Sequence, residues 1–287
     1  QFTFQYTSHP TWLAIQSLPY LMEYEHECAE QTFARYYANA LASEIISSNP
    51  KIATLFENWR KNGKLNSKLE ENEELKSIIL AETPWLKDAE TEDEKKKNLA
   101  LLFDLEKMKT SQEATFDKLK QKQKASGGFA WFDGSNESEY ITRHILAGLG
   151  HLSKLSKTEY SNQKIDAIAK TGIPFLDIKF LQYYKNSTKD LKPAEKLIWI
   201  NPYSDLHYLY TRSFYLDKYP LSDTLQIATK LYLETAKKDW LKYSLYEKGL
   251  AALTLNRFGE SETAKKIIES LKETSSNNED WGMYWIA

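Results

Sequence analysis

The chain has few of the residues that cross-link or interrupt a fold. Cys28 is the only cysteine in 287 residues, so no internal disulfide bond can form. Glycine occurs only 10 times and proline only 8 times, and this scarcity of helix breakers permits long helices almost throughout. No apolar run approaches the length of a membrane span. The 38 basic and 40 acidic residues leave a formal charge of -2 without a basic stripe, which argues against a nucleic-acid partner.

The first residues also lack targeting features. Residues 1–6 have no basic start and no long apolar core, so they do not form a signal peptide, and the chain does not begin with methionine. We therefore expect a fragment of a longer multidomain protein.

Apolar residues recur with helical spacing along most of the chain. The 18 Tyr, 12 Phe and 8 Trp suit interfaces between helices, where one end of a Tyr or Trp ring is buried and the other end meets water. The pattern predicts an all-α chain of ten to twelve helices with no convincing strand. Paired helices can stack into a solenoid or close into a toroid, and the pattern alone does not choose between them. The clearest expected helices cover residues 29–47, 92–123, 140–152, 162–184, 202–214, 223–233, 243–258 and 261–271.

The arrangement of Cys28 and Gln31 suggests an unusual reaction. A helix that begins here places positions i and i+3 on one face, so a thiol and a side-chain amide would lie side by side. The sulfur of Cys28 could then displace ammonia from Gln31 and form an internal thioester, and the positive end of the helix dipole would favour the thiolate. The alternative is a buried, inert thiol beside a surface glutamine.

Four stretches carry a resemblance to a known family. Residues 27–31 read ECAEQ and precede the aromatic run TFARYY at 32–37, while SLPYLMEY occupies 17–24. GGFAWF follows at 127–132, with YIT at 140–142, and GMYW lies at 282–285. Together these stretches resemble the thioester domain of the alpha-macroglobulin and complement family, in particular its bacterial members, and they span most of the chain.

The resemblance implies both a fold and an activity. It implies that residues 1–287 form a single thioester-containing domain, an α/α toroid of inner and outer helices. The thioester would join Cys28 to Gln31, with Glu30 as a supporting residue of the motif. The intact protein would be a protease inhibitor of the cell envelope, periplasmic or at the outer surface, whose partners are target proteases and its own other domains. Capture is a single-use reaction, so the domain would not be an enzyme, and any membrane attachment would come from other parts of the protein.

The same resemblance implies how the bond is attacked and protected. Complement-type relatives carry a histidine in the loop after the Gly-Gly-Phe turn, which passes the acyl group to hydroxyls. Residues 129–134 contain no histidine, so we expect direct attack by amines such as lysines of a trapped protease. A stored thioester must be shielded from water. Four aromatic residues are the expected shield, although Trp131 and Phe132 could equally plug a core: Tyr20, Tyr24, Trp131 and Phe132.

The remaining residues suggest other chemistry. His144 and His151 lie two turns apart on an expected helix and could pair with Cys28, although ordinary helix histidines are the simpler interpretation. No motif has metal-ligand spacing, so neither a metal nor another cofactor is expected. Two alternative functions stay open, a non-catalytic protein-binding scaffold and a helical-toroid hydrolase acting on carbohydrate. The hydrolase would draw its carboxylates from Glu30, Asp133, Glu137 and Asp205, among which the sequence singles out no pair.

Overall fold

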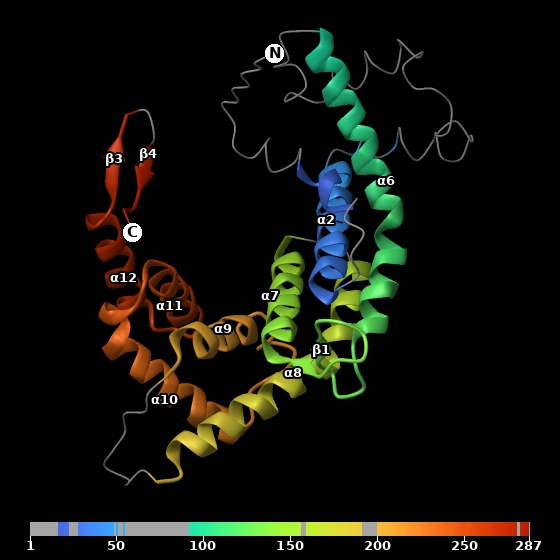
Figure 1. Ribbon diagram of the computed structural model, residues 1–287. Coiled ribbons are helices and arrows are strands. Elements are labelled where there is room, and N and C mark those ends of the chain that lie inside the picture. Colours follow the sequence, from blue (N-terminus) through green and yellow to red (C-terminus); the bar gives the residue numbers. More distant parts are fainter. Residues whose placement is uncertain are drawn as a thin grey trace. The chain divides into compact units, whose positions relative to one another are not determined.

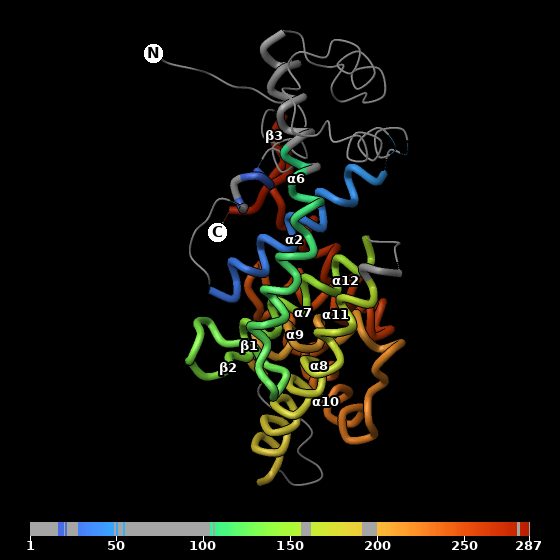
Figure 2. The backbone as a smooth tube through the Cα atoms, turned by 90° about the vertical axis from the view of Figure 1, so that its right-hand side faces the viewer, coloured from blue at the N-terminus to red at the C-terminus, as the bar shows by residue number. Residues whose placement is uncertain are grey.

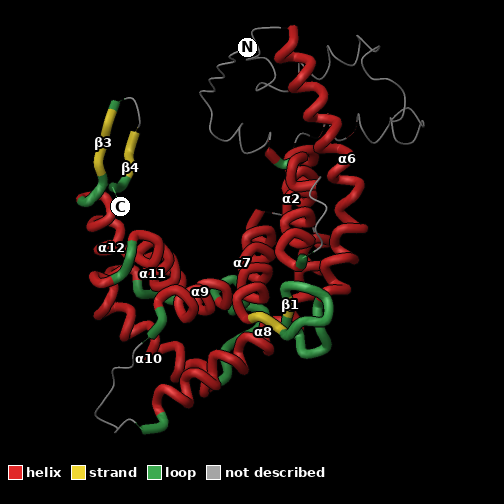
Figure 3. Tube along the Cα trace, viewed as in Figure 1, coloured by secondary structure: helices red, strands yellow, loops and turns green. Residues whose placement is uncertain are grey.

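A computed structural model describes residues 17–22, 28–48, 50, 54, 92–155, 159–190, 200–279 and 282–286 (Figure 1). For residues 20, 22, 92–103, 106 and 159–161 only the backbone is described. Eight α-helices dominate these segments and the strands are few and short, which confirms the all-α class (Figure 3). The chain divides into two compact units, which we describe separately: unit 1 comprises residues 1–122 and 154–158, and unit 2 comprises residues 123–153 and 159–287.

Unit 1 is built on a pair of helices, α2 (Ala29–Ser48) and α6 (Glu92–Lys122), with a short 3-10 helix, η1 (Pro19–Met22), beside them. The two long helices lie side by side in both Figure 1 and Figure 2. Their bounds agree with the predicted helices 29–47 and 92–123. The interface is aromatic and aliphatic, because Tyr36 contacts Phe116 at 5.5 Å between ring centroids and Leu119 is fully buried.

One polar pair crosses this interface. Asn39 is fully buried on α2, and its Nδ2 donates to Thr115 Oγ1 on α6 at 3.0 Å. Thr115 is also buried and donates to the carbonyl of Ser111 at 3.1 Å in its own helix. A buried amide is costly unless it is hydrogen-bonded, so this pair selects one register between α2 and α6.

Unit 2 begins with a tight turn and a short hairpin, β1 (Phe129–Ala130) paired antiparallel with β2 (Glu137–Ser138). Gly127 has a φ of 93°, and a Cβ there would lie 2.1 Å from the carbonyl oxygen of Thr171, so only glycine fits. The side-chain amide of Gln123 donates to the carbonyls of Gly127 at 2.9 Å and of Ile168 at 3.0 Å. The turn is therefore held against the helix that contains Ile168.

Six α-helices make up most of the remaining part of unit 2 that the structure describes, and their caps follow from the sequence. Ser222 accepts a hydrogen bond from the N–H of Leu225 at the start of one helix, and Gly259, with a φ of 89°, follows the end of the next. Pro174 lies inside its helix. The six helices are α7 (Glu139–Leu155), α8 (Glu159–Thr188), α9 (Pro202–Arg212), α10 (Asp223–Asp239), α11 (Leu245–Arg257) and α12 (Ser261–Glu273).

An aromatic cluster joins α8, α9 and α10 in the core of unit 2. The ring of Phe180 stacks on Tyr208 at 4.2 Å and lies 4.6 Å from Tyr232, measured between centroids. Beside it, Asp177 accepts hydrogen bonds from the hydroxyl of Tyr208 at 2.6 Å and from Nε of Arg212 at 3.0 Å. Arg212 is only 2% exposed, so this ion pair is a buried tie between α8 and α9.

The elements that the sequence did not predict are all short. They are the β1–β2 hairpin, a second antiparallel hairpin of β3 (Ser276–Asn278) and β4 (Gly282–Tyr284), and a 3-10 turn, η4 (Trp240–Lys242). Strands of two or three residues are too short to display an alternating pattern, so nothing in the sequence marked them.

Candidate functional site

Cys28 lies directly before the first residue of α2, as expected from the sequence. The thiol is 6% exposed, and the backbone N–H of Gln31 donates to its sulfur at 3.4 Å. The sulfur therefore occupies the place that a serine or aspartate oxygen takes at a capped helix start. Thr32 secures the turn, because its N–H and its hydroxyl both donate to the carbonyl of Cys28, at 3.0 Å and 2.9 Å.

The side-chain amide of Gln31 has an oxygen atom without a hydrogen-bond partner among the described residues. Its Oε1 is buried and accepts no hydrogen bond from any residue that the structure describes. Its neighbour Glu30 is exposed in the first turn of the helix, where a carboxylate interacts favourably with the helix dipole. Thus the thiol and the amide occupy the first turn of α2, and the supporting glutamate faces solvent.

Packing behind this turn fixes its position. Ala29 is fully buried and Phe33 is nearly so, with the ring of Phe33 lying 5.7 Å from that of Tyr37 on the same helix. Phe33 and Tyr37 are four residues apart and share a helix face. The aromatic run after the motif therefore anchors the first turn of α2 in the core of unit 1.

The expected aromatic shield falls on three different parts of the chain. Tyr24 lies outside the described residues, and Tyr20 lies in η1, where only its backbone is described. Trp131 and Phe132 belong to unit 2, at the tip of the β1–β2 hairpin, and are 38% and 65% exposed. They do not plug the core of unit 2, and their approach to Cys28 stays a prediction.

The histidines have structural partners in unit 2. The ring of His144 lies 6.3 Å from Tyr140, and that of His151 lies 5.1 Å from Phe214. Burial lowers the pKa of His151, and the charge of Arg257 lowers it further. His9 and His26 lie outside the described residues. A pairing of His144 or His151 with Cys28 would join the two units and stays a prediction.

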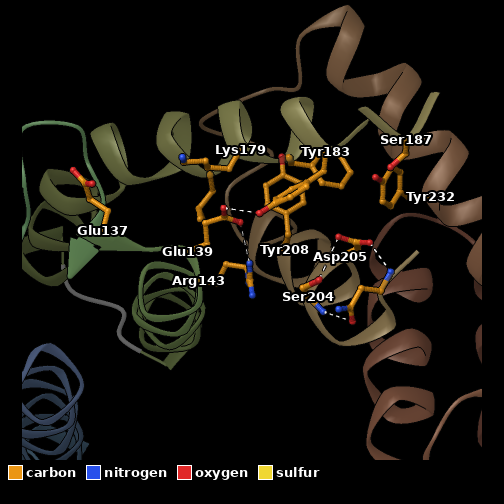
Figure 4. A pocket seen from close by; sticks show the side chains of 13 residues that line it. Glu137, Glu139, Arg143, Lys179, Tyr183, Ser187, Ser204, Asp205, Tyr208 and Tyr232 are labelled. Carbon is orange, nitrogen blue, oxygen red and sulfur yellow. Dashed lines mark hydrogen bonds and ion pairs between the residues drawn. The ribbon is translucent and has the colours of Figure 1, made fainter. Parts of the chain in front are cut away.

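Unit 2 also contains a cavity of about 470 Å³ at the junction of α7, α8, α9 and α10 (Figure 4). Glu139 forms its centre, because it accepts a hydrogen bond from the hydroxyl of Tyr183 at 3.0 Å and lies 3.6 Å from Arg143. The wall carries carboxylates, cations and aromatic rings together. Its principal side chains are Glu137, Glu139, Asp205, Arg143, Lys179, Phe180, Tyr183, Tyr208 and Tyr232.

The electrostatics of the cavity differ from one carboxylate to the next. Burial raises the pKa of Asp205 to about 6, although the N–H of Asn201 donates to this carboxylate at 2.8 Å. Hydrogen bonds from its own backbone and from Ser126 lower the pKa of Glu137. Burial also lowers the pKa of His207, on the same helix as Asp205, to about 4. Asp205 therefore keeps its proton to a higher pH than Glu137 does.

Two of the carboxylates nominated from the sequence line this one cavity, and two do not. Glu137 and Asp205 contribute to the wall, whereas Glu30 lies in unit 1 and Asp133 lies at the tip of the β1–β2 hairpin. Figure 4 shows Glu137 and Asp205 toward opposite ends of the group, with Glu139 and Tyr208 between them. Sequence reasoning missed Glu139 and Arg143, although their i, i+4 spacing at a helix start signals a paired acid and base.

Comparisons with protein-family models, curated proteins and solved structures found no match for this chain. Among the described residues, no three or more His, Cys, Asp or Glu side chains are grouped so that they could hold a metal ion. Within the same segments, no helix has a stretch long and apolar enough to cross a bilayer.

Proposed function

We propose that this chain is the covalent capture domain of an alpha-macroglobulin-like protease inhibitor, and that Cys28 and Gln31 form its internal thioester. The observation that carries the proposal is the turn at the start of α2, where the N–H of Gln31 donates to the sulfur of Cys28 at 3.4 Å. This turn keeps the thiol within one helical turn of the amide that it must attack. The proposal also rests on the family resemblance of the motif and its flanking stretches.

The chemistry balances without a cofactor. During formation, Sγ of Cys28 bonds to Cδ of Gln31, the bond from Cδ to Nε2 breaks, and the thiol proton leaves with that nitrogen as ammonia. During capture, an amine of the trapped protease bonds to Cδ, the bond to sulfur breaks, and the thiolate takes up the proton lost by the amine. Each molecule reacts once, so the domain is an inhibitor and not an enzyme.

Two features of the first turn favour this reaction. The N–H of Gln31 and the positive end of the α2 dipole both stabilise the negative charge that develops on sulfur as it leaves. The buried Oε1 of Gln31 accepts no hydrogen bond within the described residues, which is costly for an amide oxygen. A thioester oxygen is a weaker acceptor than an amide oxygen, so conversion to the thioester relieves part of that cost.

The helical content supports the finer architecture of the proposal, an α/α toroid in which paired helices alternate between an inner and an outer ring. Target proteases and the other domains of the same protein are the proposed partners, and the cell envelope is the proposed location. A protease would cut a bait segment elsewhere in the protein, and the rearrangement would expose the bond to lysines.

Intact-mass measurement of the freshly purified full-length protein tests the proposal. We expect a mass lower by one ammonia than the sequence mass, and exposure to methylamine should restore the mass by adding one methylamine while one thiol appears. Cys28→Ser is the control, because it keeps a capping atom at the helix start but cannot form the bond. A wild-type protein with the full sequence mass and a free thiol before any treatment would contradict the proposal.

A further inference from the structure

An exposed row of aromatic rings lies beside the cavity of unit 2. Trp131 stacks on Tyr140 with a centroid distance of 5.9 Å, Tyr140 lies 6.5 Å from Tyr203, and Tyr203 lies 5.8 Å from Tyr246. Each of these four rings is more than a third exposed. We call them the aromatic row. They come from the β1–β2 hairpin, α7, α9 and α11, so the fold brings together rings from four separate segments.

Two residues of the row are sequence neighbours of residues that line the cavity. Tyr140 directly follows Glu139, and Tyr203 directly precedes Ser204, and both neighbours line the cavity. Large apolar groups gathered at one exposed place mark an interaction surface, whereas single exposed rings need no explanation. The row therefore extends the cavity wall with a surface on which a flat, partly apolar ligand can stack.

Behind the cavity wall, one buried donor lacks an acceptor. Arg143 is 7% exposed, and its Nε has no hydrogen-bond partner among the described residues. Its only ion pair there is with Glu139, at 3.6 Å, which is longer than a good hydrogen bond. An unpaired buried guanidinium nitrogen is costly, and Nε is too deeply buried for a ligand to reach, so Arg143 contributes its positive charge to the cavity wall and not this donor.

The mixture of groups narrows the class of ligand. An anion would meet the carboxylates of Glu137, Glu139 and Asp205, and a cation would meet Arg143 and Lys179. An apolar ligand would displace water from these five polar groups without offering them any hydrogen bond, which is costly. A neutral polyhydroxylated ring can bind both the carboxylates and the cationic side chains, because a hydroxyl donates to a carboxylate and accepts from a cation. The C–H face of the same ring packs on an aromatic side chain.

We infer that the cavity and the aromatic row of unit 2 together bind a carbohydrate chain, with one sugar ring in the cavity and further rings along Tyr140, Tyr203 and Tyr246. This site uses neither Cys28 nor Gln31 and does not depend on the bond between them, although Trp131 also belongs to the expected shield. It gives unit 2 a second role, which is to hold the protein on a glycan surface.

Saturation-transfer NMR and titration calorimetry on the full chain test the site, with cellohexaose and chitohexaose as probes. We expect saturable binding of at least one of the two hexasaccharides. Lys179→Ala removes a donor from the cavity, and Trp131→Ala removes the end of the aromatic row. Each should weaken binding by about tenfold, the value of one good contact.

Matched controls separate the site from general effects. Lys185 is an exposed lysine on the same helix as Lys179, and Trp285 is 37% exposed, as Trp131 is at 38%, but it lies outside the row. Lys185→Ala and Trp285→Ala should bind as the wild type does, and so should protein treated with methylamine. The inference is overturned if neither hexasaccharide binds, if all variants bind equally, or if inorganic phosphate or free arginine displaces the sugar from the cavity.

Discussion

The backbone N–H of Gln31 donates a hydrogen bond to the sulfur of Cys28, at 3.4 Å, across the first turn of α2. A cysteine thus serves as the cap of the helix that carries the proposed acyl group. Because the sulfur and the Gln31 side chain both belong to this turn, the stability of the helix start and the chemistry of the thioester are coupled. This coupling leads to the first prediction.

Cys28→Ala should destabilise unit 1 more than Cys28→Ser does, because alanine removes the capping atom whereas serine replaces it with a better acceptor. We expect a difference of about 1 kcal/mol in the free energy of unfolding. Urea unfolding followed by circular dichroism measures it, with methylamine-treated wild type as the reference so that no thioester contributes. Equal stability of the two variants would show that a capping atom at position 28 contributes little.

Replacement of both Trp131 and Phe132 by alanine should speed spontaneous loss of the thioester in the full-length protein. The two rings are exposed in unit 2, and burying such apolar surface gains about 25 cal/mol per Å², so a partner surface is favoured. The rate at which a free thiol appears in native buffer is the measurement, and Trp285→Ala is the matched control. An unchanged rate with an intact fold would rule out the shield.

Thr115→Val should destabilise unit 1 by roughly 1–3 kcal/mol, because it leaves the buried amide of Asn39 without its 3.0 Å partner. Thr115→Ser keeps the hydroxyl and should cost less. Thr110→Val is the control, since Thr110 is exposed on the same helix. Hydrogen exchange of α2 and α6 reports the change. The double variant Asn39→Leu with Thr115→Val should recover stability, and failure to do so would mean that the unpaired amide is not what destabilises Thr115→Val.

The pH dependence of unit 2 should reflect two opposing groups on α9. The folded pKa of Asp205, about 6, lies above its ordinary value of 3.8, so the folded state holds an extra proton and stability falls as pH rises from about 4 to 6. The folded pKa of His207, about 4, lies below its ordinary value of 6.5, so stability falls instead as pH drops through the same range. In the wild type the two effects largely cancel.

Single substitutions should therefore reveal opposite slopes. As pH rises from 4 to 6, the free energy of unfolding of Asp205→Asn should increase by roughly 2 kcal/mol relative to the wild type. That of His207→Gln should decrease by a similar amount relative to the wild type over the same interval. Denaturant unfolding at closely spaced pH values measures both differences. Parallel pH profiles for both variants and the wild type would show that neither group is titrating as described.

Much of the helical framework could be predicted, because helix starts and ends depend on local chemistry. The start of α2 at Ala29, the serine cap at Ser222 and the glycine after α11 at Gly259 all follow from neighbouring residues alone. The hairpins could not be predicted, because their strands are too short for a pattern, and the turn before β1 also depends on the contact of Gln123 with Ile168, 45 residues away. The sequence pattern did not single out Arg143, because only the structure shows that this side chain is buried at the cavity.

The sequence by itself determined the helical class, most helix bounds in the described residues, and the nearness of Cys28 to Gln31, since all three depend on interactions within one or two turns. Only the tertiary structure decided that Asn39 meets Thr115 and that Trp131, Tyr140, Tyr203 and Tyr246 form one row. It alone gathered Glu139, Arg143 and Asp205 around one cavity. Such groupings join residues tens of positions apart, and the packing of whole helices, which no local pattern encodes, selects them.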